Sequence, residues 1–77
     1  MKQEFTISLF SESHIGILSR ITLILTRRQI NIESITASES AVPGVQMLTM
    51  VVRTTPEIVQ KVARQIEKVV DVLKVFV

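Results

Sequence analysis

Hydrophobic and polar residues alternate near the start of the chain, and the alternation then changes to a longer period. Between residues 4 and 10, successive side chains fall on opposite sides of an extended backbone, which is typical of a β-strand. From Gly16 to about residue 28, apolar residues recur at spacings of three and four, which predicts an amphipathic helix. The apolar side chains are Phe5, Ile7 and Leu9 in the strand and Ile17, Leu18, Ile21, Ile24 and Leu25 in the helix.

The second half of the chain predicts two more strands, a second helix and a final strand. Residues 30–40 have strand composition and stop before Pro43-Gly44, a turn signal, after which residues 45–53 predict a third strand. Thr55-Pro56-Glu57 indicates a helix start, because threonine caps free N–H groups, proline fits the first turn and a carboxylate faces the positive helix end. Helical spacing follows at Ile58, Val59, Val62, Ala63, Ile66 and Val69. Residues 71–77 predict the last strand, with Leu73, Val75 and Val77 on one face.

The predicted order is strand, helix, strand, strand, helix, strand, in which each helix connects two strands. Right-handed crossovers favour a ferredoxin-like βαββαβ sandwich, an α+β fold with two helices on one face of a four-stranded antiparallel sheet. The other face has no second layer within the chain. If strand alternation holds, this open face carries Thr6, Ser8, Phe10, Met47, Thr49 and Val51.

Length and composition change this picture in one respect. A chain of 77 residues, 47% of them hydrophobic, allows one domain. Such a chain buries roughly 60% of the surface that its unfolded form exposes, so its stability alone is marginal. It has no cysteine for disulfides or thiolate metal sites, so association with other chains is the expected source of further stability. We therefore expect an oligomer.

Charge and hydropathy predict a soluble cytoplasmic protein. The net charge is +2, with the two signs interleaved, which is too weak a balance for a nucleic-acid-binding protein. The first residues are not followed by the apolar run of a secretory signal. No stretch approaches the roughly 18 apolar residues of a membrane-spanning helix. Neither a nucleic acid nor a membrane is an expected partner.

Few side chains could perform catalysis. The chain has one histidine, one aspartate and six glutamates, without cysteine or tyrosine, so no catalytic group or metal-site spacing stands out and no cofactor is expected. RNA-binding domains of this topology stack bases on aromatic residues of their middle strands, and this chain has three phenylalanines in total. Acylphosphatase, an enzyme of the same topology, holds phosphate with an arginine in the first loop. Here that loop has none, and Arg20 lies a full turn into the helix.

The loop before the first helix predicts a site for an anion. A helix N-terminus has free N–H groups that attract a carboxylate, and Gly16 lets a ligand approach the backbone closely. Ile15, Ile17 and Leu18 surround this point, so a small molecule with one carboxylate and one branched apolar side chain would be matched at both ends. His14 lies in the same loop, without a carboxylate or second histidine near it in the sequence to make it a base.

Three separated segments carry a family resemblance. They are Gly16-Ile17-Leu18-Ser19-Arg20-Ile21, Asn31-Ile32-Glu33-Ser34-Ile35 and Asp71-Val72-Leu73-Lys74-Val75. Together they resemble the ACT domain of the small regulatory subunit of acetohydroxyacid synthase, also called acetolactate synthase. Because the resemblance runs over nearly the whole chain, we expect residues 1–77 to be a single ACT domain, either a short-form small subunit or one domain of a longer one.

The resemblance implies a regulatory subunit without catalytic activity, whose thiamine-diphosphate-dependent partner is a separate large subunit. Domains of this family pair through their second strands into homodimers and bind an amino-acid effector at the interface. The usual effector is valine, as feedback on branched-chain amino-acid biosynthesis. Binding would bias a conformational equilibrium that reaches the catalytic subunit. One chain would contribute Ser13, His14, Ile15, Gly16, Ile17 and Leu18, and the other Asn31 and Ile32.

Other functions stay open at this point. The family usually has asparagine where Ser13 stands, and serine makes fewer hydrogen bonds, so a structural activator that binds no effector is one alternative. The ACT domain of a different enzyme and an acylphosphatase-like hydrolase are two others. Glu33 and Glu39 are interpreted as charges that set the register of a pairing strand. Leu23 and the open face are candidates for a surface that docks the catalytic subunit.

Overall fold

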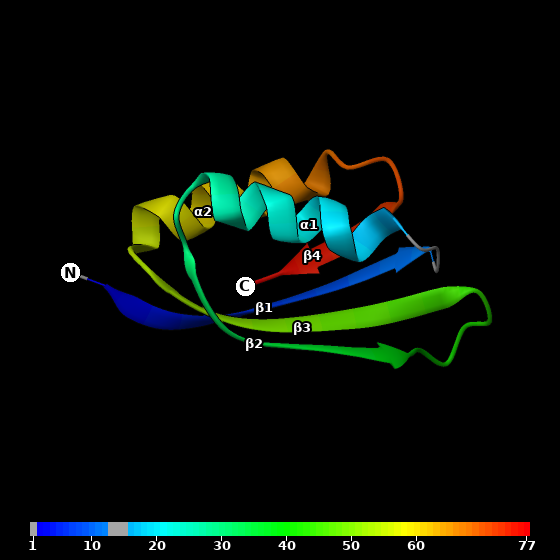
Figure 1. The fold of residues 1–77 in the computed structure, drawn as a ribbon. Helices are drawn as coiled ribbons and strands as arrows, with labels where there is room; N and C mark the ends of the chain where they lie inside the picture. The colour runs from blue at the N-terminus through cyan, green and yellow to red at the C-terminus, as the bar shows by residue number, and fades with distance from the viewer. Residues whose placement is uncertain (1, 13–15) are drawn as a thin grey trace.

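The computed structural model of the chain describes residues 2–12 and 16–77. Its elements follow the predicted order and are β1 (Gln3–Glu12), α1 (Gly16–Arg27), β2 (Asn31–Glu39), β3 (Val45–Thr54), α2 (Pro56–Glu67) and β4 (Val72–Phe76). The strands form one antiparallel sheet in the order β2-β3-β1-β4, and both helices cover the same face of it (Figure 1). The predicted ferredoxin-like fold is confirmed.

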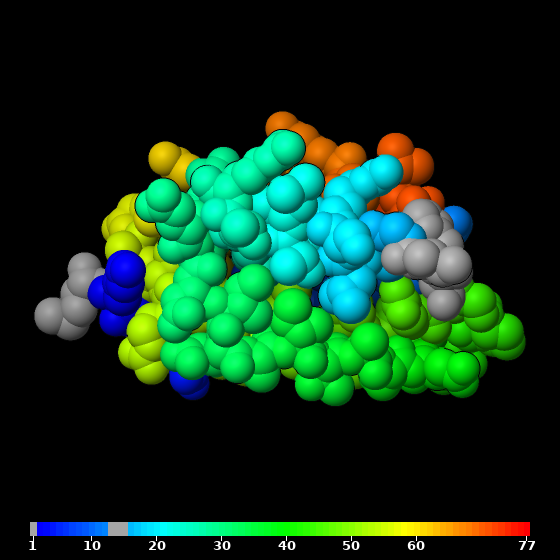
Figure 2. Space-filling view, in the orientation of Figure 1, coloured from blue at the N-terminus to red at the C-terminus, as the bar shows by residue number. Residues whose placement is uncertain are grey.

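The core lies between the helices and the sheet and is built from the predicted apolar stripes. The buried helix residues are Ile17, Ile21 and Leu25 of α1 and Val59, Val62, Ala63 and Ile66 of α2. The buried apolar strand residues are Ile7, Leu9, Leu48, Met50 and Val52. α1 packs on the β2 side of the sheet, and its atoms lie against those of β2 in the space-filling view (Figure 2). α2 packs against β4 and β1. The edge strand β2 therefore lies beside α1, and α2 covers the β4 side of the same face.

The turn between α1 and β2 is a Schellman motif that places Gln29 in the left-handed region, with φ +57°. The Ile30 N–H donates to the Leu25 carbonyl at 3.1 Å, and the Gln29 N–H donates to the Thr26 carbonyl at 2.9 Å. Ile30 is buried, which anchors the turn in the core. The left-handed residue is thus Gln29, and Asn31 already belongs to the strand.

Two turn signals read from the sequence are confirmed. The Thr55 hydroxyl accepts a hydrogen bond from the Ile58 N–H at 3.3 Å, and proline follows as the first residue of α2. In the hairpin between β2 and β3, the Val45 N–H donates to the Val42 carbonyl at 3.1 Å. Gly44 has φ +81°, as the third position of a type II turn requires.

The open face of the sheet carries the residues predicted for it. The register of β1 and β3 pairs Thr6 with Val51, Ser8 with Thr49 and Phe10 with Met47. At the β4 side of this face, the rings of Phe10 and Phe76 meet edge to face with centroids 6.1 Å apart. The face is therefore partly apolar, and within the described residues no second layer covers it.

The prediction that Leu73, Val75 and Val77 share one face is wrong. The register between β4 and β1 shifts at Leu73, which has no partner on β1 and forms a bulge. The alternation is interrupted there, so Val72 and Val75 both pack against the core. Leu73 is instead 55% exposed and borders a cavity on the open face.

Candidate functional site

The first half of the predicted site lies at the start of α1. Gly16 is the first residue of the helix, Ile17 is buried in the core and Leu18 is partly exposed. The first turn has no acidic residue, so its N–H groups and the positive end of the helix dipole favour an anion. The other predicted residues of this half, Ser13, His14 and Ile15, lie outside the described residues.

The second half of the predicted site lies at the opposite end of the sheet. Asn31 and Ile32 begin β2, where Asn31 is paired with Arg53 and Arg53 with Glu4 near the start of β1. β1 and β2 run in the same direction, because each is antiparallel to β3, and α1 follows the far end of β1. α1 runs back from that end to the start of β2, and its 12 residues, at a rise of about 1.5 Å each, separate the two halves by roughly 18 Å. A single chain therefore does not bring the two halves together.

The end of the sheet nearest the start of α1 is polar on its helix-facing side. In the preceding row this side carries Leu9 and Leu48, which are buried. In the last row Ser11 is paired with Gln46, and Gln46 is paired with Glu39. Directly opposed residues of antiparallel strands share a face, so Ser11, Gln46 and Glu39 form one row, here called the polar row.

Ser11 is the buried member of the polar row. Its side chain is fully buried, and its Oγ makes no hydrogen bond to any of the described residues. An unpaired buried hydroxyl costs stability, about 1–3 kcal/mol in proteins. Sequence reasoning missed this row. The signal that could have found it is the series Phe5, Ile7, Leu9, in which the next member on the same face is a serine.

A cavity adjoins the polar row. It has a volume of about 500 Å³ and lies between the end of β2, the turn at residues 40–44 and the start of β3, with Glu39 and Gln46 in its wall. Binding sites for small molecules in proteins usually have volumes of roughly 300–1,000 Å³. The cavity is thus large enough for an amino acid, and it lies at the same end of the sheet as the start of α1.

Comparison with known protein families matches residues 7–74 to the AHAS small subunit-like ACT domain. The chain belongs to this family. The resemblance drawn from the three sequence segments is therefore confirmed. Among curated relatives, the probable acetolactate synthase small subunit of Methanothermobacter thermautotrophicus is 38% identical over 69 residues, which cover 90% of this chain and 41% of the relative. The acetolactate synthase small subunit of Bacillus subtilis is 41% identical over 76 residues, covering 97% of this chain and 43% of the relative.

Solved structures place this ACT domain in the same fold. The crystal structure of the acetolactate synthase small subunit from Thermotoga maritima matches with a TM-score of 0.87 and 30% identity, over 96% of this chain and 46% of that one. The ACT domain from GTP pyrophosphokinase of Chlorobium tepidum matches with a TM-score of 0.82 at 18% identity, over 99% of this chain and 97% of that one, a likeness of fold alone. The chain spans less than half the length of the small subunits that it matches.

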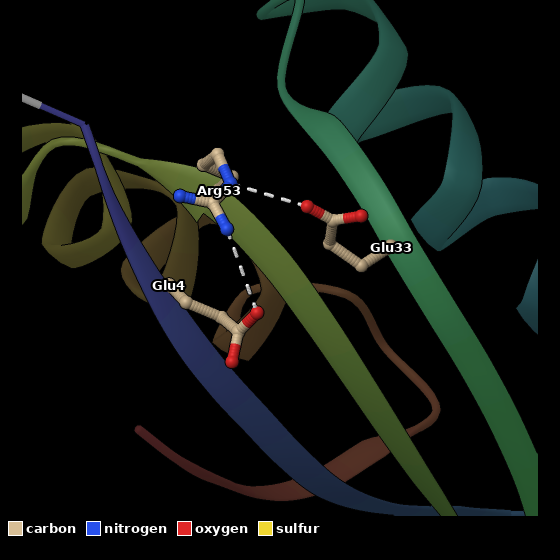
Figure 3. Close-up of polar contacts among 3 residues, drawn as sticks. All are labelled: Glu4, Glu33 and Arg53. Carbon is tan, nitrogen blue, oxygen red and sulfur yellow. Dashed lines mark hydrogen bonds and ion pairs between the residues drawn. The ribbon is translucent and has the colours of Figure 1, made fainter.

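At the start of β2, Arg53 joins this strand of the ACT domain to β1. Its Nε donates to Glu33 Oε1 at 3.1 Å, and a second guanidinium nitrogen lies 3.8 Å from Glu4 Oε2 (Figure 3). The register of β2 shifts by one residue at Glu33, directly after Ile32. All three side chains are well exposed to solvent, so each pair contributes at most about 1 kcal/mol. The pairs link β2, β3 and β1 next to the strand start on which Asn31 and Ile32 lie, and they contribute little to its stability.

A stripe of two leucines with serine and threonine between them runs along the exposed side of α1 in this ACT domain. Its residues, here called the α1 stripe, are Leu18, Ser19, Thr22, Leu23 and Thr26. The Thr22 hydroxyl donates to the Leu18 carbonyl at 2.7 Å, and the Thr26 hydroxyl donates to the Thr22 carbonyl at 2.8 Å. Both hydroxyls are thereby satisfied within the helix, so the stripe can be covered without leaving these donors unpaired.

A second cavity lies on the open face and has a different chemistry. It has a volume of about 570 Å³ and is lined mainly by apolar residues, among them Phe10, Met47 and Leu73. The hydroxyl of Ser40, at its edge, already donates to the Val45 carbonyl at 2.9 Å. This cavity offers no partner for the charges of an amino acid, which distinguishes it from the cavity beside the polar row.

Among residues 2–12 and 16–77, no three side chains of the metal-binding types gather in one place. In the same part of the chain, neither helix has the length and apolar character that crossing a membrane requires.

Proposed function

We propose that this chain is the ACT domain of an acetohydroxyacid synthase small subunit, which binds a branched-chain amino acid such as valine and transmits this binding to a separate catalytic subunit. Membership of the family supports the proposal, as do the names of its relatives. The observation that carries it is the separation of roughly 18 Å, the length of α1, between the two halves of the predicted site. Such a site requires a second copy of the chain.

The β2 edge provides the geometry for that second copy. β2 is an edge strand in the order β2-β3-β1-β4, and its unpaired backbone groups can pair with another strand. Two β2 strands that pair antiparallel about a twofold axis place the start of one beside the end of the other. Asn31 of one copy then lies beside Glu39 of the other, at the end of the sheet where α1 begins. The two halves of the site meet twice in each dimer.

The α1 stripe extends the same interface. Because α1 packs on the β2 side of the sheet, joining two β2 edges brings two α1 stripes face to face. Leu23 is 48% exposed in the single chain, and burial of such apolar surface drives association at about 25 cal/mol per Å². Backbone pairing at β2 and apolar contact at α1 would act together.

The effector chemistry follows from the start of α1. The helix N-terminus would hold the carboxylate, and Ile17 and Leu18 would present apolar surface to a branched side chain. Ser13, His14 and Ile15 would complete this half of the site. Calorimetric titration of the full chain with valine, leucine and isoleucine tests the proposal. At a ligand concentration 100-fold above Kd, binding stabilises the protein by about 2.7 kcal/mol. For a domain of this length that raises Tm by roughly 10–20 °C.

The dimer is tested by light scattering on two matched variants. Leu23→Glu places a charge in the α1 stripe and should convert the dimer to a monomer with an unchanged circular dichroism spectrum. Val70→Glu makes the corresponding change at a residue that is 87% exposed in the turn before β4, and it should leave the dimer intact. A Leu23→Glu protein that stays dimeric would exclude the α1 stripe from the interface.

A structural activator without an effector is the second candidate function, and Ser13 favours it. Serine at this position makes fewer hydrogen bonds to a ligand than the asparagine usual in the family. In that case the chain would co-purify with the large subunit and change its activity, while titration with the three amino acids would give neither heat nor a Tm shift. The assay measures the activity of the large subunit in four conditions: alone, with valine, with this chain, and with both this chain and valine.

A further inference from the structure

We propose that the polar row is the floor of the amino-acid site and that the Glu39 carboxylate accepts the ammonium group of the effector. This inference rests on the proposed function and assigns residues that the predicted site does not contain. Its starting point is the charge of the ligand. A free amino acid carries an ammonium group as well as a carboxylate, and a charge taken out of water needs a partner of opposite sign.

The predicted site has no anion for that ammonium group. Its eight residues offer a helix N-terminus, apolar side chains, a serine, a histidine and an asparagine, and none of them carries a negative charge. The missing carboxylate must come from the residues around the start of α1. Two described glutamates end strands there, Glu12 on β1 and Glu39 on β2.

The register of the sheet separates these two glutamates. Glu12 is paired with Val45 and lies in the series of the open face, whereas Glu39 is paired with Gln46 in the polar row, on the side of the helices. Glu39 also stands on the β2 edge, where the proposed dimer brings Asn31 of the second copy. Asp71 is the other carboxylate at this end, and it lies on the β4 side of Ser11, because its carbonyl accepts from the Glu12 N–H at 2.9 Å. Glu39 is therefore the carboxylate that faces the helix side next to the second copy.

The buried Ser11 hydroxyl points independently to a ligand. It is fully buried at the end of β1, five residues before α1 begins, and it has no hydrogen-bond partner among residues 2–12 and 16–77. An apolar side chain would suit a purely structural core position better, as Ile7 and Leu9 do on the same face. A polar ligand group above the polar row would give the Ser11 hydroxyl its partner. The cavity of about 500 Å³ is lined by Glu39 and Gln46, the neighbours of Ser11 in the polar row, and Ser11 itself lies beneath the surface next to them.

This placement revises the interpretation of Glu39 from the sequence. Glu33 pairs with Arg53 within the chain at the start of β2, which agrees with a charge that fixes strand geometry. Glu39 stands at the other end of the same strand. The two glutamates of β2 are thus assigned different roles, Glu33 in structure and Glu39 in ligand binding.

The test compares valine with isovalerate, the same molecule without its ammonium group, by calorimetry on the full chain. We expect the wild type to bind valine more tightly than isovalerate. Glu39→Gln should weaken valine binding by about tenfold to a hundredfold, the usual effect of losing a charged hydrogen bond, and should leave isovalerate binding unchanged. Glu39→Asp keeps the charge and should recover part of the affinity. Glu12→Gln and Asp71→Asn, which remove charge nearby, should leave the ratio of the two affinities as in the wild type.

Ser11→Ala separates a ligand contact from a packing defect. If the hydroxyl contacts the ligand, the variant should have a higher Tm without ligand and bind valine more weakly. Unchanged valine affinity in Ser11→Ala would remove Ser11 from the floor of the site.

The outcomes keep the two proposals apart. A wild type that binds none of the three amino acids refutes effector binding, and with it the role of Glu39. A wild type that binds valine, together with a Glu39→Gln variant that binds valine equally well or loses valine and isovalerate alike, refutes the role of Glu39 alone. Circular dichroism of each variant confirms that the chain is folded.

Discussion

A substitution at Gln29 tests how much the turn between α1 and β2, which precedes Asn31, contributes to the stability of the fold. It is the non-glycine residue with positive φ in the described structure, at +57°, in the position of a Schellman motif that glycine usually occupies. Replacing it with glycine removes the contact between Cβ and the backbone that disfavours this conformation. The two hydrogen bonds of the motif, from the N–H groups of Gln29 and Ile30, need no side chain at position 29.

The expected size of the effect follows from two opposing terms. A left-handed conformation costs an L-residue roughly 1–2 kcal/mol, and this cost is relieved in glycine. Glycine has more freedom in the unfolded chain, which offsets roughly 0.5–1 kcal/mol of that gain. At the midpoints of these two ranges, Gln29→Gly should therefore stabilise the fold by about 0.75 kcal/mol, which for a chain of this length raises Tm by roughly 3–6 °C.

The assay is thermal unfolding at one fixed protein concentration, because Tm of an oligomer depends on concentration. Gln60→Gly is the matched control. Gln60 is exposed in the interior of α2, where glycine should destabilise the fold by roughly 0.5–1 kcal/mol. The same substitution thus has opposite signs at the two positions. A Gln29→Gly variant that melts at or below the wild-type temperature would refute the argument from the backbone.

Three further changes test the elements that position the site. Thr55→Ala removes the acceptor for the Ile58 N–H and should cost about 1 kcal/mol in urea unfolding, whereas Thr55→Ser should retain most of that stability. Gly44→Ala should cost roughly 1–2 kcal/mol in the same assay, because alanine is strained at φ +81°. No neighbouring atom lies within 4 Å of the new Cβ, so the cost comes from the backbone alone, and Gly44→Asn should cost less. Ile21→Ala, in the centre of the core, should cost about 2–5 kcal/mol, while Val70→Ala at an exposed turn should change stability by less than about 0.5 kcal/mol.

Local signals in the sequence predict the fold because each acts within one turn or one strand. The spacing of Ile17, Ile21 and Leu25 depends only on helical periodicity, and these three residues are the buried positions of α1. The cap at Thr55 and the turn at Gly44 likewise need a few neighbouring residues and no partner strand. Such signals fix element order, and the right-handed crossover rule then limits the topology.

The bulge at Leu73 and the polar row could not be predicted in the same way, because both depend on pairing between distant strands. Whether Leu73 faces the core is decided by its register with β1, and a shift of one residue exchanges the two faces. The polar row needs three strands to be aligned before Ser11, Gln46 and Glu39 become neighbours. In the sequence, Ser11 lies near the end of one strand, Gln46 near the start of another and Glu39 at the end of the edge strand, and no motif connects them.

In the proposed site, the separation of the two halves at opposite ends of β2 has a consequence for regulation. If each effector contacts the α1 end of one copy and Asn31 of the other, a monomer can supply only part of the contacts. The ligand then stabilises the dimer, and by thermodynamic linkage dimerisation raises the affinity for the ligand by the same factor. Apparent valine affinity should therefore fall on dilution of the chain to concentrations at which the dimer dissociates. In Leu23→Glu it should be weak at all concentrations, even though no residue of the predicted site has been changed. A monomeric Leu23→Glu protein that binds valine as tightly as the wild type would show that one chain is sufficient, and would place the whole site at the α1 end.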